Sequence, residues 1–157
     1  MPPATSVLPP PSDPGYAERV RGSFARQGAM ATIGARLAAI EPGRVELDLP
    51  WSEAITQQHG FVHAGIMAAA LDTACGYAAA TLMPADSGVL TVEFKINLLA
   101  PARGARFRIQ GRVRKAGRTI TVAEGEAHGF DDDGPGRLVA TLSATVMTIA
   151  GRAGVNG

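Results

Sequence analysis

The stretch QQHGFVHAGIMAAALDTACGYAAA, residues 57–80, decides how this chain folds. From His63 to about Leu82 alanine and leucine dominate and Pro84 follows, which predicts a long helix that ends before the proline. This helix would be apolar on nearly every side, and a helix of that kind is buried rather than laid across a surface. We therefore expect a central helix that the rest of the chain surrounds.

Extended segments precede and follow this helix in the sequence. Residues 31–40 and 44–49 are typical of a hairpin with a tight turn at EPG. After the helix, four runs alternate apolar and polar residues and have short connections, which predicts an antiparallel meander. These runs are residues 89–99, 105–115, 119–130 and 137–149. The predicted fold class is α+β, with a six-stranded curved antiparallel sheet wrapped around the long helix.

The first run after the helix has the clearest alternation. Its apolar side chains are expected on one face and its polar ones on the other. The apolar set is Leu90, Val92, Phe94, Ile96 and Leu98, and the polar set is Thr91, Glu93, Lys95 and Asn97.

The length of 157 residues suggests one domain. A flexible proline-rich tail is expected over residues 1–12, the domain over 13–150, beginning with a helix capped by Asp13, and a second tail over 151–157. The net charge of +1 gives no electrostatic case for binding nucleic acid or a membrane surface. The single cysteine excludes an internal disulfide, and no cluster has zinc-ligand spacing. We find no secretory signal or membrane span and expect a cytoplasmic protein.

Asp72 is the one charged residue in the apolar helix. An ionised carboxylate surrounded by hydrocarbon is costly unless it is paired or hydrogen-bonded. Its neighbours one turn away are Ala68, Ala69, Cys75 and Gly76, and none of them can pair with it. Asp72 therefore faces a solvated gap beside the helix, or it lines a pocket and acts on a substrate as a general base.

His63 stands at the start of the same helix, nine residues before Asp72. At about 100° and 1.5 Å per residue, the two lie on opposite sides of the helix and roughly 13.5 Å apart along it. They cannot share one active site within one chain. If both act, a second copy completes the site, as in a symmetric dimer. The alternative is that His63 only caps or packs against the helix.

The amides of Ala64 and Gly65 lie in the first turn of this helix. Amides there lack intrahelical partners and carry the positive end of the helix dipole. Such donors suit a carbonyl oxygen that becomes negative during acyl transfer. An amide donor, an apolar channel and an opposed carboxylate favour hydrolysis of an activated acyl group.

Three ordered motifs resemble the hotdog-fold acyl-CoA thioesterases of the phenylacetate-degradation (PaaI-like) type. They are HGFVHAG followed by Asp72, then LTVEFKINLLAPA, then KAGRTITV, and the similarity covers about residues 30–150. The resemblance implies a curved antiparallel sheet around a central helix. It implies homodimers with continuous sheets, often paired into homotetramers, and two active sites per dimer at the interface. It implies no metal and no redox cofactor, with coenzyme A entering as part of the substrate.

The resemblance also implies roles for individual residues. His63 takes the family's histidine position, and the amide of Ala64 would polarise the thioester carbonyl. Asp72 would be the nucleophile or the base that activates water, and Thr91 would hold that water. Gln57 stands where many relatives have an asparagine, so it keeps the amide with a different reach.

The remaining candidates concern the substrate. Relatives bind the phosphates and adenine of coenzyme A near the hairpin that holds Lys115 and Arg118, which makes these two candidate contacts; the alternative is that both are solvated. Gln58, beside the family's amide position, is a further candidate contact. His59 would shape the entrance, and the packing of Phe61 would contribute to the depth of the acyl pocket.

Two other functions stay open at this stage. One is a hotdog hydratase or dehydratase that acts on enoyl thioesters, although its local aspartate–histidine pattern is missing. The other is a non-catalytic protein that binds or senses acyl-CoA. Such a protein would have to act through a partner, because the first thirty residues are too short and proline-rich to form a DNA-binding helix-turn-helix. The sequence also leaves open the acyl group, which could be short, medium or aryl.

Overall fold

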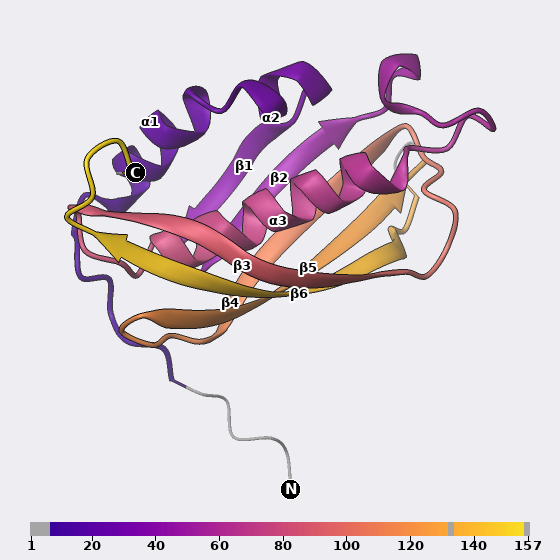
Figure 1. Ribbon diagram of the computed structural model, residues 1–157. Coiled ribbons are helices and arrows are strands. Elements are labelled where there is room, and N and C mark those ends of the chain that lie inside the picture. Colours follow the sequence, from indigo (N-terminus) through magenta and orange to yellow (C-terminus); the bar gives the residue numbers. More distant parts are fainter. Residues whose placement is uncertain (1–6, 132–133, 156–157) are drawn as a thin grey trace, which may run out of the picture.

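The computed structural model describes residues 7–131 and 134–155. A six-stranded antiparallel sheet curves around the long helix α3, and two shorter helices lie at one end (Figure 1). The α+β architecture expected from the sequence is confirmed. The helices are α1 (Tyr16–Ala25), α2 (Gly28–Ile33) and α3 (Ala64–Ala80), with the short 3-10 helix η1 (Glu53–Ile55). The strands are β1 (Arg36–Glu41), β2 (Arg44–Pro50), β3 (Ser87–Leu98), β4 (Arg106–Lys115), β5 (Ile120–Phe130) and β6 (Arg137–Ala150).

The strand order corrects one prediction. The order across the sheet is β1-β2-β4-β5-β6-β3, so β4, β5 and β6 form the expected meander but β3 does not join it at β4. β3 instead pairs with β6 and lies at the edge of the sheet, while β4 pairs with β2. Alternation along a strand encodes which face is buried and not which strand is its neighbour. The meander prediction was therefore wrong for β3.

Small residues let α3 approach the middle of the sheet closely. Gly111 of β4 lies opposite Gly125 of β5, and the two form a shallow floor beneath the helix. A β-carbon on Gly111 would stand 2.3 Å from the backbone carbonyl of Ala74, and one on Gly125 would stand 2.9 Å from the side chain of Leu71. These glycines fix the depth of α3 in the sheet.

In residues 7–131 and 134–155, no helix combines the length and apolar character required to cross a bilayer.

A β-bulge in β3 corrects the predicted alternation of that strand. Thr91 lies opposite Val146 of β6 and Glu93 lies opposite Thr145, so Val92 is the extra residue. Directly opposed residues project to the same face. Val146 is buried, which places Thr91 on the inner face toward α3, whereas Glu93 is on the outer face.

The bulge therefore divides β3 into two halves with opposite alternation. Before it, Val89 and Thr91 face inward and Leu90 faces outward; after it, Phe94, Ile96 and Leu98 face inward. The prediction that Leu90 shares a face with Phe94 was wrong, because one inserted residue exchanges the two faces.

The segment before β1 also differs from the prediction. Residues 28–33 form α2, and the expected extended segment over 31–40 begins only at Arg36. The helix ends at Gly34, whose φ of 76° favours glycine, and it buries Met30 and Ile33. α1 confirms the expected first helix, but its N-cap is Gly15 rather than Asp13.

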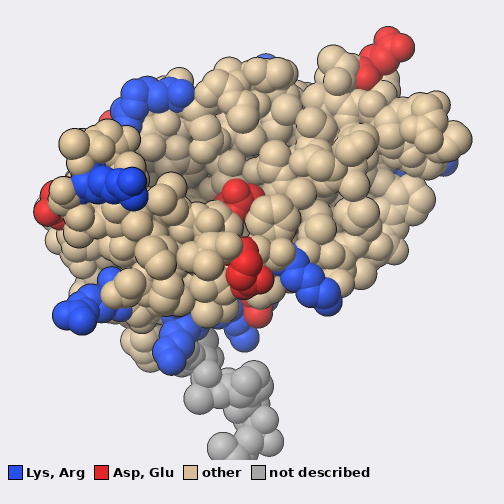
Figure 2. All heavy atoms as spheres, viewed as in Figure 1, with Lys and Arg blue, Asp and Glu red and all other residues tan. Residues whose placement is uncertain are grey.

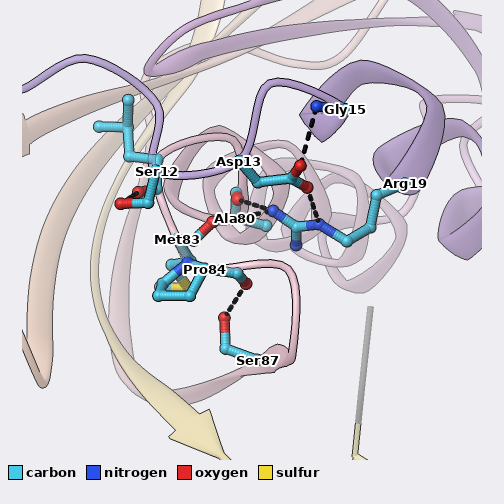
Figure 3. A network of polar contacts seen from close by, with 9 residues as sticks. Ser12, Asp13, Gly15, Arg19, Ala80, Met83, Pro84 and Ser87 are labelled. Atoms are coloured by element: carbon cyan, nitrogen blue, oxygen red, sulfur yellow. Dashed lines mark hydrogen bonds and ion pairs between the residues drawn. The ribbon is translucent and has the colours of Figure 1, made fainter.

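Asp13 and Arg19 instead join α1 to the end of α3 (Figure 3). Asp13 accepts a hydrogen bond from the amide of Gly15 at 2.8 Å and pairs with Arg19 at 2.9 Å. The guanidinium of Arg19 also donates to the backbone carbonyls of Ala80 and Met83, both at 3.0 Å. Ala80 is the last residue of α3, where a helix lacks internal donors, and Met83 lies in the turn that follows. Arg19 lowers the pKa of Asp13 below its ordinary value.

Parts of the two expected tails contact the domain. Ser12 donates a hydrogen bond to the carbonyl of Leu82 at 3.1 Å, and the carbonyl of Val155 lies close to Gly88. Residues 1–6 and 156–157 of the expected tails lie outside the described residues.

Candidate active site

Asp72 obtains its hydrogen-bond partner from the sheet and not from its own helix. The Oγ1 of Thr91 donates to the Asp72 carboxylate at 2.7 Å. The bulge at Val92 makes this possible, because it turns Thr91 inward while the rest of the strand keeps an apolar inner face. A half-buried carboxylate is thus held by a hydroxyl that can also bind water.

A cavity of about 520 Å³ opens beside this carboxylate. Its walls come from α1, α3, the first half of β3 and the C-terminal segment at Val155. Across it, Ser23 and Tyr77 share a hydrogen bond at 3.0 Å, and Thr73 donates to Gln27 at 3.2 Å. The sequence did not predict that α1 forms a wall of this cavity. Helical spacing predicted α1 itself, but it does not show which other element a helix packs against.

Cys75 lies one turn from Asp72 but is unsuited to act as a nucleophile. Burial raises the pKa of its thiol to about 12, and the charges of Asp72 and Glu124 act in the same direction. The reactive form of cysteine is the thiolate, which is scarce at neutral pH when the pKa is so high. Asp72 is therefore the better candidate for chemistry on this face of α3.

The other end of α3 is organised by His63. His63 is the N-cap residue, and its Nδ1 accepts a hydrogen bond from the amide of Gly65 at 2.9 Å. The Gly65 amide is thereby occupied. The amide of Ala64 has no hydrogen-bond partner within residues 7–131 and 134–155, and this residue is exposed. Of the two candidate amide donors, Ala64 is the one free to bind a substrate.

A second cavity, of about 380 Å³, lies at this end of the helix. Gln57, Phe61 and Ala64 line it, together with Leu98 and Leu99 at the end of β3. The side-chain oxygen of Gln57 accepts the backbone amide of His59, which leaves the Gln57 NH₂ group as its available donor. The cavity thus combines apolar walls with amide donors.

Four of the remaining predicted site residues, Gln58, His59, Lys115 and Arg118, lie outside both cavities. Gln58 and His59 are exposed on the loop before α3, with their side-chain nitrogens 3.4 Å apart. Lys115 and Arg118 are exposed at the turn between β4 and β5. The second cavity does contain Phe61, whose ring carries the guanidinium of Arg103 at 5.0 Å from its centroid.

The two cavities share no lining residue. Asp72 and Thr91 belong to the first and Ala64 and Gln57 to the second, and eight residues of helix, or about 12 Å of rise, separate Ala64 from Asp72. Within one chain the carboxylate and the free amide do not converge. Among the described residues, no group of three or more histidine, cysteine, aspartate or glutamate side chains could hold a metal ion.

Comparisons with known proteins identify the family. The family described as the thioesterase superfamily matches residues 59–135. The crystal structure of a thioesterase family protein from Silicibacter pomeroyi is 56% identical, covers 87% of this chain and all of that chain, and superposes with a TM-score of 0.85.

Two more distant relatives agree with this match. A candidate thioesterase of Ralstonia eutropha, a phenylacetic acid degradation-related protein, is 25% identical, with a TM-score of 0.72 over 84% of this chain and 98% of that chain. A candidate esterase of Saccharolobus solfataricus is 36% identical over 92 residues, which is 59% of this chain and 65% of the relative, just under two thirds of its length. The chain belongs to the thioesterase superfamily and has its hotdog fold.

Proposed function

We propose that this protein hydrolyses an acyl-CoA thioester to the free acid and coenzyme A, at a site shared by two copies of the chain. The observation that carries the proposal is the pair of half-sites on α3. Asp72 and Thr91 border one cavity, and the free amide of Ala64 borders another. The thioesterase relatives support hydrolysis as the reaction type.

In the proposed reaction the thioester carbonyl oxygen accepts a hydrogen bond from the amide of Ala64 in one copy. That donor, at a helix N-terminus, stabilises the negative charge that develops on the oxygen. Asp72 of the other copy takes a proton from a water molecule held by Thr91, or attacks the carbonyl carbon itself. The carbon–sulfur bond then breaks and coenzyme A leaves as the thiolate, which is subsequently protonated.

Isotopic labelling can reveal an attack by Asp72 on the substrate. If Asp72 activates water, a single turnover in ¹⁸O-water places the label in the released acid. If Asp72 attacks, an acyl–aspartyl anhydride forms, and water attack at the aspartyl carbon leaves the label in the protein. Label found in the protein by mass spectrometry would therefore demonstrate the anhydride, whereas label in the acid alone would exclude water attack at the aspartyl carbon.

We further propose that Lys115 and Arg118 contact the phosphates of coenzyme A. Both are exposed cations on one turn, and ammonium and guanidinium groups are suited to phosphate oxygens. Replacing both with alanine is expected to raise KM roughly tenfold with little change in kcat, because the lost contacts are equal in the ground and transition states.

A dimer, or a pair of dimers, and a cytoplasmic location belong to the same proposal.

Two substitutions test the chemistry directly, measured as thiol release from short, medium and aryl acyl-CoAs. Asp72→Asn keeps the shape of the side chain and removes the base, so turnover is expected to fall at least about 10³-fold. Ala64→Pro removes the amide hydrogen at the first helical position, where proline is tolerated. The φ of −62° and ψ of 138° at His63 also suit a residue before proline. Turnover is expected to fall about 10²- to 10³-fold, as for loss of one oxyanion donor.

Ala64→Gly is the matched control, because it keeps the amide hydrogen. It is expected to retain activity near that of the natural protein. Thermal stabilisation by acyl-CoA without any release of thiol would instead indicate a binding protein, and the enzymatic proposal would then be wrong.

A further inference from the structure

The cavity beside Asp72 continues along α3 far past the carboxylate. α1 runs antiparallel to α3 beside it, as three contacts between the two helices show. In order from the Asp72 end, these contacts join Thr73 to Gln27, Tyr77 to Ser23, and the carbonyl of Ala80 to Arg19. β3 follows the same order, from Thr91 beside Asp72 to Ser87. Arg19 therefore stands at the far end of the cavity from Asp72.

The lengths of these elements set the length of the cavity. α3 rises about 12 Å over the eight residues from Asp72 to Ala80, and the facing stretch of α1 has the same length. Residues 87–91 of β3 span about 13 Å. A molecule that enters beside Asp72 thus has about 12 Å of cavity before it reaches Arg19.

Arg19 has an unused hydrogen-bond donor at this end. Its Nε bonds to Asp13, and its Nη2 bonds to the carbonyls of Ala80 and Met83. Within residues 7–131 and 134–155, Nη1 has no hydrogen-bond partner, and Figure 3 shows that nitrogen without a dashed line.

The unused nitrogen of Arg19 is open although the side chain is only 10% exposed. Among the described residues, an oxygen of Asp48 is the one fully buried side-chain nitrogen or oxygen that lacks a partner, so Nη1 of Arg19 is not sealed in the core. Nη1 is therefore available to a molecule in the cavity that Arg19 lines.

The charges around the cavity favour an anion at the Arg19 end. Among the described residues that line it, Arg19 and Arg26 are the cations, and the anion is Asp72 at the opposite end. Asp13 offsets part of the charge of Arg19 but does not line the cavity. On the surface, acidic side chains lie near the middle of the face in Figure 2, and basic side chains gather toward its edges. A carboxylate suits the Arg19 end, because guanidinium groups bind carboxylates through charge-assisted hydrogen bonds.

We propose that this cavity binds the acyl group of a dicarboxylic acid thioester, with the thioester carbonyl beside Asp72 and the free carboxylate on Nη1 of Arg19. This inference rests on the acyl-CoA hydrolysis proposed above and names its substrate class. Carbon–carbon bonds of about 1.5 Å advance an extended alkyl chain by about 1.3 Å each, so an acyl group of about eight carbons spans about 9 Å between its two carboxyl carbons. A charge-assisted hydrogen bond of about 2.8 Å completes the distance of about 12 Å.

Binding to a protein that does not turn over tests this assignment. The Asp72→Asn protein, titrated by calorimetry, is expected to bind suberyl-CoA about tenfold more tightly than octanoyl-CoA, because the two differ only in the terminal carboxylate. Succinyl-CoA and butyryl-CoA are the length control. The succinyl carboxylate lies only about 4 Å from the thioester carbonyl and cannot reach Arg19, so succinyl-CoA should bind no more tightly than butyryl-CoA. Suberyl-CoA that binds no more tightly than octanoyl-CoA would overturn the proposal, as would an equal gain for succinyl-CoA.

Substitutions in the same Asp72→Asn background test the role of Arg19. Arg19→Lys keeps a positive charge beside Asp13 and lacks the third nitrogen, so the preference for suberyl-CoA should fall below about twofold. Arg21→Lys is the matched control, since Arg21 is exposed on the same helix, pairs with Glu18 and lies outside the cavity. It should keep the preference. Equal preferences in the two variants would overturn the role of Arg19.

Asp13→Asn adds a variant whose expected effect is a gain, which a misfolded protein cannot produce. It removes the anion that shares the guanidinium of Arg19, so the preference for suberyl-CoA over octanoyl-CoA should rise about threefold. A preference that falls or stays constant would contradict a carboxylate bound at Arg19.

Thiol release from the natural protein separates this inference from the proposed hydrolysis. Asp72-dependent hydrolysis of octanoyl-CoA, without tighter binding of suberyl-CoA, would leave the hydrolysis intact and overturn the dicarboxylic substrate. Tighter binding of suberyl-CoA without thiol release from any thioester would support the assignment of the cavity and overturn the hydrolysis.

Discussion

Replacing Thr91 with valine isolates the contact that holds Asp72. Valine has nearly the same shape and lacks the hydroxyl, so the hydrogen bond of 2.7 Å to the carboxylate is lost without a large cavity. Hydrogen bonds to charged groups contribute about 1.5–3 kcal/mol when they are buried. Asp72 is half-buried and water can replace part of the contact, so we expect Thr91→Val to cost about 1–1.5 kcal/mol.

Urea unfolding at one fixed protein concentration measures this difference, because association would make stability depend on concentration. The control is Thr91→Ser, which retains the donor and is expected to stay within about 0.5 kcal/mol of the natural protein. A double-mutant cycle with Asp72→Ala should give a coupling of about 1 kcal/mol. Equal stability of the valine variant and the natural protein would show that the hydrogen bond from Thr91 to Asp72 does not stabilise the fold, and an equal loss in the serine variant would show that the hydroxyl is not its cause.

Three further predictions concern stability and reactivity. Gly111→Ala places a methyl group against the backbone of α3 and should cost about 3 kcal/mol or more in urea unfolding, whereas Gly28→Ala, where no atom lies within 4 Å, should be nearly neutral. Folding raises the pKa of the Cys75 thiol to about 12, so the stability that the protonated thiol contributes is present below pH 9 and declines from pH 9 to 12. Cys75→Ala should lack that decline when thermal melts are measured in alkaline solution. A variant whose stability falls with pH as the natural protein's does would contradict this prediction. Arg19 lowers the pKa of Asp13, so the stability that the ionised Asp13 contributes is present above about pH 4 and lost in more acid solution. The free energy of unfolding of Asp13→Asn should therefore lie below that of the natural protein at pH 7 and equal it by about pH 2. A difference that stays constant between these pH values would contradict a stabilising ion pair.

The sequence predicted the elements of this fold because their signals are local. Alanine-rich composition and Pro84 located α3, and strict alternation located β3 to β6 near their observed bounds. The order of the strands depends on contacts between distant segments, which alternation does not encode. The bulge at Val92 was equally hidden, since one inserted residue leaves an apolar–polar pattern that still looks continuous.

The candidate site was predicted only in part, because some of its features are local in the sequence and others depend on contacts between distant segments. The position of Asp72 in an apolar helix marked it as unusual, and the regular geometry of a helix was sufficient to separate it from His63. Its contact with Thr91 depends on the bulge, so periodicity alone could not show it; the family resemblance had placed Thr91 near the attacking water. Helix capping by His63 was one of the two alternatives that the sequence left open, and the sequence could not decide between them because the bond from the Gly65 amide depends on a side-chain rotamer at the helix cap.

Subunit mixing measures whether Asp72 and Ala64 act in one site from two different chains. Asp72→Asn and Ala64→Pro proteins are each nearly inactive in the proposed mechanism. When equal amounts are unfolded together and refolded, half of the dimers are mixed, and each mixed dimer has one site free of both substitutions. About a quarter of the natural thiol-release activity is therefore expected to return. Activity no greater than the average of the two separate variants, in a sample where mixed dimers are demonstrated, would contradict it.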